Sequence, residues 1–196
     1  MKKPDPVLRE LGPSSSFSVP HAQCRVGALF FLNILEEETA RVRMAADNEG
    51  GTPEVLDRIA AETALERQAL SEAVQVFAAM ALESAVNLLG VLALGEEQFL
   101  RELERRPLLE KLSTLLKVIE GKSPSESDEM LVVAGRLADA RNAFVHPKPQ
   151  EGPLRHVARE RRSDLSSAQA AIDDMEHFLG LLRKRNYRYS IFFTRF

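Results

Sequence analysis

Residues 74–94 read VQVFAAMALESAVNLLGVLAL, and this stretch decides the fold. If it is wound as an α-helix, apolar side chains point to almost every side, and a helix of that kind belongs in the interior of a protein. It is the second half of a pattern from Pro53 to about Leu94 that predicts one long helical stretch. We therefore expect this helix at the centre of a bundle, with other helices packed around it.

Glu83, Ser84 and Asn87 are polar residues within the apolar stretch. Glu83 and Asn87 are four positions apart and so share one face of the helix. A buried carboxylate is costly unless it has a partner or is neutralised by a shifted pKa. Two interpretations of Glu83 follow: it meets a partner as part of a functional site, or it points through a gap to solvent.

Turn signals predict helices on both sides of the central one. A first helix is expected from about Ala22 to Asp47, closed by the Asn-Glu-Gly-Gly run at 48–51. Thr52 then caps the next helix, and Pro53 occupies its first position.

Further along, Pro107 begins a helix with a stripe of leucines, which ends at Gly121. The run Ser-Pro-Ser-Glu at 123–126 has the pattern of a capping box and predicts the start of another helix. That helix must end before Pro147, because the residue preceding a proline is disfavoured in the helical conformation. A last helix is expected from Ser163 to about Arg185.

The expected fold is therefore all-α, an up-and-down bundle of about five to six helices. We divide the chain into a flexible, proline-rich N-terminal arm (1–21), a single helical bundle domain (22–185) and a basic, aromatic C-terminal tail (186–196). The hydrophobic content of 44% is enough for one core without disulfides or structural metals.

Cys24 is the only cysteine, so the chain has no intrachain disulfide and no cysteine-based metal site. This usage fits a reducing compartment, and we expect a cytoplasmic protein. No run approaches the roughly 18 uninterrupted apolar residues that span a bilayer, and no signal-peptide core follows Met1. We expect no membrane attachment, no metal and no cofactor.

The charge is distributed unevenly along the chain. Residues 141–196 carry 11 Lys and Arg against 6 Asp and Glu, whereas residues 1–140 carry 15 against 23. A local basic region attracts phosphates even in an acidic protein, although a solvated face of mixed charge is the alternative. Five basic and five aromatic residues are interleaved in 183–196. This pattern suits stacking on unpaired bases, a dimer seam or an edge strand. The candidate nucleic-acid contacts are Lys148, Arg155, Arg159, Arg183, Arg185 and Arg188.

The segment 141–147, Arg-Asn-Ala-Phe-Val-His-Pro, is the one whose residue types suggest a catalytic site. On a helix, Asn142 and His146 lie on one face, and Arg141 lies about 140° from His146. Histidine titrates near neutrality and so exchanges protons with hydroxyl groups and leaving oxygens. Arginine presents a fork of donors that matches a phosphate. Together they are suited to cleaving RNA without metal, with the ribose 2′-hydroxyl as nucleophile.

Arg141-Asn142-Ala143-Phe144-Val145-His146 resembles the signature of the HEPN superfamily, which is Arg, four residues, then His, often with a polar residue after the Arg. More loosely, the resemblance extends over about residues 70 to 185, including the central helix with its embedded Glu83. It implies a HEPN-like helical bundle that pairs through its motif helices, so that two copies of Arg141 and His146 line one cleft. Many members are metal-independent endoribonucleases of toxin–antitoxin, CRISPR-linked or anti-phage systems.

The resemblance suggests roles for individual residues. His146 is the general acid or base, Arg141 holds the scissile phosphate, Asn142 orients one of them, and Glu83 with Asn87 supports the site. Superfamily toxins paired with a nucleotidyltransferase carry Tyr two residues after the His, whereas this chain has Lys148, which argues against that subgroup.

A non-enzymatic alternative stays open, because some members are inactive scaffolds or binding modules. The chain is then a regulatory module that binds a protein, such as an antitoxin, or a nucleotide, with Arg141 and Asn142 capping helix carbonyls and His146 packed under Pro147. The other histidines form no rival site: His21 is expected in the arm, His156 in a loop and His177 in a surface salt contact.

Overall fold

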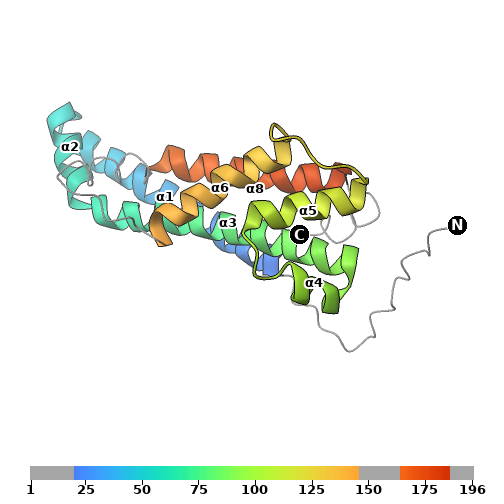
Figure 1. Ribbon diagram of the computed structural model, residues 1–196. Coiled ribbons are helices and arrows are strands. Elements are labelled where there is room, and N and C mark those ends of the chain that lie inside the picture. The colour runs from blue at the N-terminus through green and yellow to red at the C-terminus, as the bar shows by residue number, and fades with distance from the viewer. Residues whose placement is uncertain (1–19, 146–163, 186–196) are drawn as a thin grey trace, which may run out of the picture.

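The computed structural model describes residues 20–145 and 164–185, and all seven of the elements assigned there are helices (Figure 1). The expected all-α fold is confirmed. The helices are α1 (Pro20–Asn48), α2 (Pro53–Glu62), α3 (Ala64–Leu94), α4 (Glu96–Glu102), α5 (Leu108–Glu120), α6 (Glu129–Val145) and α8 (Leu165–Arg185).

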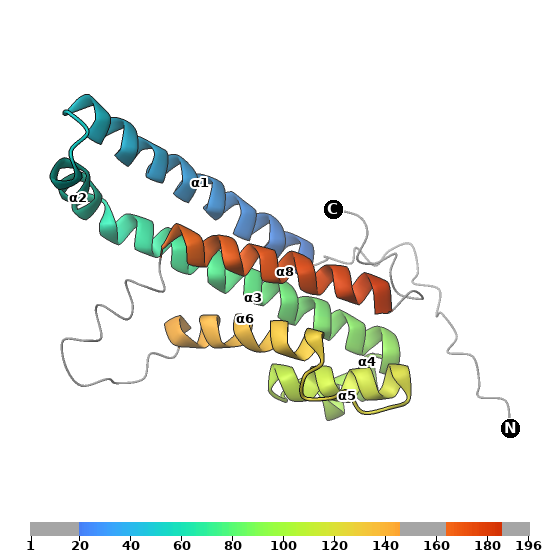
Figure 2. The ribbon, with the colours of Figure 1, turned by 90° about the horizontal axis from the view of Figure 1, so that it is seen from above.

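Helix α3 is the centre of the bundle and contacts each of the other six helices. Seen from above, α8 crosses over α3, α1 lies along one side and α6 along the other, with α4 and α5 near the C-terminal end of α3 (Figure 2). The reason is the apolar character of α3, whose side chains Val74, Leu82, Val86 and Leu89 are fully buried. A second, smaller core of Val42, Ala46 and Ile59 joins α1 to α2.

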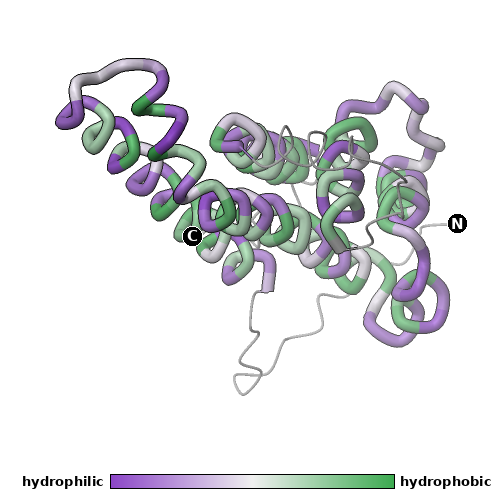
Figure 3. Tube along the Cα trace, turned by 90° about the vertical axis from the view of Figure 1, so that its left-hand side faces the viewer, coloured by the Kyte–Doolittle hydropathy of each residue, from purple (hydrophilic) through white to green (hydrophobic). Residues whose placement is uncertain are grey.

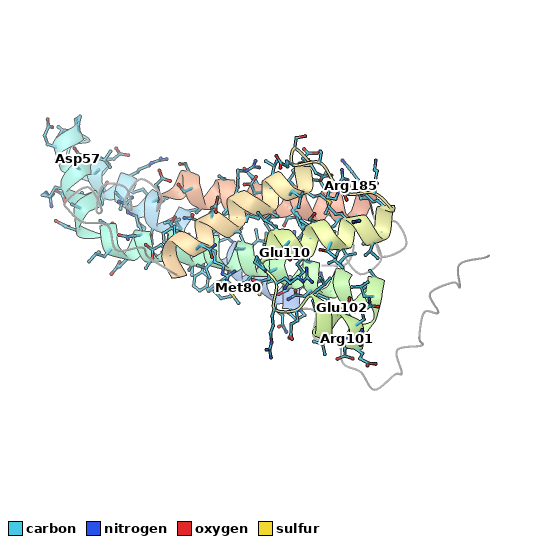
Figure 4. The ribbon with its side chains drawn as sticks, in the orientation of Figure 1. Asp57, Met80, Arg101, Glu102, Glu110 and Arg185 are labelled. Carbon is cyan, nitrogen blue, oxygen red and sulfur yellow. The ribbon has the colours of Figure 1, made fainter. Side chains whose placement is uncertain are left out.

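One face of α3 is only partly covered by these helices. Eight residues on it are half-buried or exposed, and they recur at a spacing of three and four along the helix. Met80 lies on this face and is 42% exposed (Figure 4). We call these residues the open face of α3: Val76, Phe77, Met80, Glu83, Ser84, Asn87, Leu88 and Val91.

Helix α3 is also long and apolar enough to cross a membrane, by length and composition alone. The core helix of a soluble protein passes the same test, and α3 occupies that position here. Along the other helices, hydrophobic and hydrophilic residues alternate, as Figure 3 shows. The structure is thus compatible with a soluble protein.

The turn signals around the first two helices are confirmed. Gly50 and Gly51 both have positive φ, and the Gly51 amide donates to the Ala46 carbonyl at the end of α1. The Thr52 side chain accepts a hydrogen bond from the Val55 amide at the start of α2. Gly121, with a φ of 75°, ends α5 in the left-handed conformation.

Five details differ from the sequence-based expectations. The stretch from Pro53 is two helices, because the chain bends at Thr63 and the Arg67 guanidinium donates to the Ala60 carbonyl of the preceding helix. Helix α4 was not predicted, since its seven residues are too few to show a period.

Two further differences concern helix starts, and the last concerns His21. The Asp128 carboxylate, not the 123–126 box, caps α6 by accepting from the Met130 amide, and the helix begins at Glu129. Asp164 caps α8 by accepting from the Ser167 amide, so that helix begins at Leu165 rather than Ser163. In both places the carboxylate accepts from an amide in the first turn of the helix, which is the role of an N-cap residue. His21, expected in the arm, is a buried residue of α1.

Candidate functional site

Arg141 lies in the last turns of α6 and reaches across to the central helix. One of its guanidinium nitrogens, Nη1, lies 3.1 Å from Oε2 of Glu83 on α3. The two side chains are 29% and 34% exposed, so the pair lies at the edge of the open face and not in the core. Both interpretations of Glu83 are thus partly right: it has a partner, and it keeps contact with solvent.

One turn further along α3, Asn87 meets a cation from α5. The ammonium of Lys111 donates to Oδ1 of Asn87 at 2.7 Å and lies 5.8 Å from the centre of the Phe99 ring. Lys111 is only 1% exposed and is among the largest fully buried side chains of the described residues. Burial lowers the pKa of its ammonium, an effect that the nearby carboxylates of Glu83 and Glu104 partly offset.

These four side chains form one group, which we call the α3 polar cluster: Glu83, Asn87, Lys111 and Arg141. Three helices supply them, and the two residues from α3 are those predicted to support the site. The fold therefore brings together the predicted residues Glu83, Asn87 and Arg141, which are up to 58 positions apart.

Lys111 was missed by sequence reasoning. It lies between Leu108 and Leu115 at helical spacing, inside the leucine stripe of α5, and this position was the available signal. A lysine there is more often a residue that extends its stem to solvent, so the pattern alone offered no reason to single it out.

Of the other predicted site residues, Asn142, Arg183 and Arg185 lie in the described part of the chain. Asn142 is exposed in the last turn of α6. His146, Lys148, Arg155, Arg159 and Arg188 lie outside the described residues, as do residues 1–19 of the arm and the tail.

Two predicted nucleic-acid contacts lie in α8 and are engaged within the fold. The Arg183 guanidinium donates to the carbonyl of Leu179 in its own helix. The Arg185 guanidinium donates to both carboxylate oxygens of Asp128, at 2.9 and 2.8 Å. A phosphate would have to compete with these acceptors, so RNA contact by Arg183 and Arg185 stays a prediction.

A shallow pocket of about 210 Å³ lies where α6, α3 and α8 meet. Gln75, Asp139 and Phe144 are among its lining residues, and Arg141 is not. His177, predicted to make a surface salt contact, does so with Oε1 of Glu129 at 2.8 Å. In the described ranges no group of three or more His, Cys, Asp or Glu is arranged to hold a metal ion.

No protein-family model, curated protein or solved structure matches this chain. The resemblance to the HEPN superfamily therefore rests on the sequence motif at 141–146 and the looser sequence pattern of residues 70 to 185, and it stays a prediction.

Proposed function

We propose that this chain is a HEPN-type, metal-independent endoribonuclease. The observation that supports the proposal most is the contact between Arg141 and Glu83. The motif arginine and the embedded glutamate, singled out independently in the sequence, meet at 3.1 Å on a partly exposed edge of the bundle. An arginine held in this way is pre-oriented, and a guanidinium fork matches the geometry of a phosphate.

In the proposed reaction, His146 takes the proton from the ribose 2′-hydroxyl as that oxygen attacks the neighbouring phosphorus. The 5′-oxygen of the next nucleotide then leaves and receives a proton, which gives a 2′,3′-cyclic phosphate and a free 5′-hydroxyl. Arg141 stabilises the charge that develops on the phosphate. Asn142 orients either Arg141 or His146. Because the nucleophile belongs to the substrate, the reaction needs no bound metal.

We further propose that two copies pair through the open face of α3 and the neighbouring end of α6. Five of the eight residues on that face are large and apolar, an unusual composition for the surface of an isolated chain. A second copy would cover them and bring two Arg141–Glu83 pairs together. Partnership with an antitoxin or other regulatory protein, a role in defence, and a cytoplasmic location belong to the same proposal.

The decisive experiment is a cleavage assay on mixed single-stranded RNAs with a chelator present. His146→Ala and Arg141→Ala are expected to lower the rate by about 10²–10⁴-fold. The matched controls are His177→Ala and Arg136→Ala, since each removes a residue of the same type that is ion-paired on the surface. Background rates in the wild type, or equal rates in all five proteins, would end the nuclease proposal.

The pairing is tested by the mass of the protein in solution. Met80→Glu places a charge on the open face and is expected to convert a dimer to a monomer, as measured by light scattering after gel filtration. Met44→Glu is the control, because Met44 is more exposed, at 66%, but lies near the far end of α1. A wild-type monomer at all concentrations tested would remove this part of the proposal.

The second candidate function is a non-enzymatic module that binds a protein or nucleotide. It is favoured by the same ion pair, since the Glu83 carboxylate already neutralises Arg141. A chain that pairs as expected but leaves RNA intact would identify this alternative.

A further inference from the structure

Lys111 is an unusual residue to find in the core of a helical bundle. Lysine is almost never fully buried unless it is paired, and among the hydrogen bonds of the described residues its ammonium has one acceptor, the Asn87 amide oxygen. An ammonium has three N–H donors, so this environment satisfies it incompletely. An apolar side chain of the same length would fill the space at lower cost. The position of Lys111 therefore suggests a role other than packing.

Its charged surroundings indicate what that role is. From α3, Glu83 and Asn87 face Lys111; from the turn after α4, Glu104 does; and the ring of Phe99 lies beneath it. Arg141 comes from α6 and contacts Glu83 directly. The Glu83 carboxylate thus interacts with two cations: Arg141, which it contacts, and Lys111, whose hydrogen bond is to Asn87, one turn further along α3.

The charge of Lys111 affects how strongly Arg141 is attracted toward Glu83. With Lys111 charged, the three ionised groups sum to +1, and part of the field of the carboxylate is offset by the lysine. Without Lys111, the sum is zero and Glu83 interacts with Arg141 alone. Because these groups are partly or fully buried, their interactions are screened less than those between surface charges.

We propose that Lys111 is a positioning residue of the Arg141 site, whose buried charge offsets the Glu83 carboxylate so that Arg141 remains available to a phosphate of the RNA. The RNA part of this inference rests on the proposed function. The electrostatic part does not, because it concerns only how tightly Glu83 and Arg141 interact.

The first experiment measures that interaction without RNA. A double-mutant cycle with Arg141→Gln and Lys111→Met tests this. It compares the coupling of Arg141 to its site, which is the ratio of unfolding equilibrium constants with and without Arg141→Gln, in the presence and in the absence of the Lys111 charge. We expect this coupling to rise at least about threefold with Lys111→Met, because the lysine no longer offsets the field of Glu83 at Arg141. Lys117→Met is the control, because Lys117 is an exposed lysine on the same helix and is expected to leave the coupling unchanged. A coupling that stays constant or falls in the Lys111→Met background would overturn the inference.

If Lys111→Met fails to fold, Lys111→Gln takes its place, since it removes the charge and still offers a donor to Asn87. The same rise in coupling is expected, and a coupling that does not rise would equally overturn the inference. Lys111→Arg, which restores the charge, is expected to return the coupling toward the wild-type value.

The second experiment measures binding of a mixed-sequence 2′-O-methyl RNA, which lacks the attacking hydroxyl. Lys111→Met is expected to weaken binding about fivefold, and Lys117→Met to leave it unchanged. Equal binding by wild type and Lys111→Met would overturn the inference. If the wild type binds no RNA, the proposed function fails, and the double-mutant cycle alone decides the role of Lys111.

A pH profile separates this electrostatic role from packing. Burial lowers the pKa of Lys111, so its charge disappears at a pH below the 10.5 of an ordinary lysine. RNA binding by the wild type should therefore weaken at alkaline pH until it equals that of Lys111→Met. Binding by Lys111→Met should show no such decrease. Parallel profiles for the two proteins would contradict the proposed mechanism.

Discussion

Helix α6 has two sides, and its charged residues are organised differently on each. Toward α8, the pairs Arg136–Asp174, His177–Glu129 and Arg185–Asp128 form what we call the outer seam. Toward α3, the α3 polar cluster joins α6 and α5 to the central helix. The first group consists of matched pairs, whereas the second contains a buried cation with an incomplete set of acceptors.

The difference shows which charges were placed for stability and which were not. In the outer seam the Arg136 guanidinium meets both oxygens of Asp174, at 2.8 and 2.5 Å, and this partner raises the pKa of Arg136. Such an exposed pair fixes the register of two helices at little cost. Burying Lys111 costs stability instead, and a group retained at that cost is a candidate for function.

The largest effect on stability is expected at Gly90, which lies against the Phe99 ring beside the α3 polar cluster. A Cβ added at Gly90 would lie 2.3 Å from the Phe99 ring, on which the Lys111 ammonium rests. Gly90→Ala should therefore lower the free energy of unfolding by about 1–3 kcal/mol, measured by urea denaturation. Gly180→Ala on α8 meets nothing within 4 Å and should instead raise it by about 0.5–1 kcal/mol. Similar changes at both positions would show that α4 is not packed tightly on α3.

A second prediction concerns the stability cost of Lys111 and its sign. Because its pKa is lowered in the folded state, the unfolded chain binds more protons between the folded pKa and the ordinary value of 10.5, and wild-type stability should rise with pH across that alkaline interval. Lys111→Met should be as stable as the wild type or more so, by up to about 1–2 kcal/mol at pH 7. The advantage should shrink as the pH rises, in thermal unfolding measured from pH 7 to 10. A clear loss of stability at pH 7 would mean that Lys111 is structural.

Most of the fold could be predicted from local chemistry. The apolar run in α3 places that helix at the centre, and Gly51, Thr52 and Gly121 fix the ends of three helices, because each of these signals acts within a few residues. Helix α4 could not be predicted, since its seven residues are too few to show a period, and no glycine or proline marks the bend at Thr63. The starts of two later helices were also misplaced, because Asp128 and Asp164 are their caps.

The site could be predicted only in part, and for a related reason. Arg141 stands out because the motif surrounds it, and Glu83 because a charge interrupts an apolar helix. Lys111 does not stand out, because a lysine at that spacing looks like a surface residue until the fold places α4 over it. That these residues meet is a property of the tertiary structure, which the sequence pattern did not contain.

A third, smaller effect is expected at the start of the outer seam. The Asp128 carboxylate both caps α6 and binds Arg185, and its side chain is only 9% exposed. Asp128→Ala should lower the free energy of unfolding by about 1–2 kcal/mol, measured by urea denaturation. Ser123→Ala, which removes the residue that the 123–126 box had suggested as the cap, should change it by less than about 0.5 kcal/mol. The opposite ranking would restore the capping box.

The smallest effect is expected for the pair of the outer seam with the best geometry. Arg136 is 54% exposed, so its pairing with Asp174 gains little over hydration and is weakened by salt. Arg136→Gln should lower the free energy of unfolding by at most about 0.5–1 kcal/mol at low ionic strength, and the loss should decrease at about 1 M NaCl. Arg141→Gln, on the side of α6 that faces α3, should respond less to salt because its pair is less exposed. An equal salt response on both sides would mean that Glu83 and Arg141 form an ordinary surface pair, and the distinction between the two sides of α6 would then disappear.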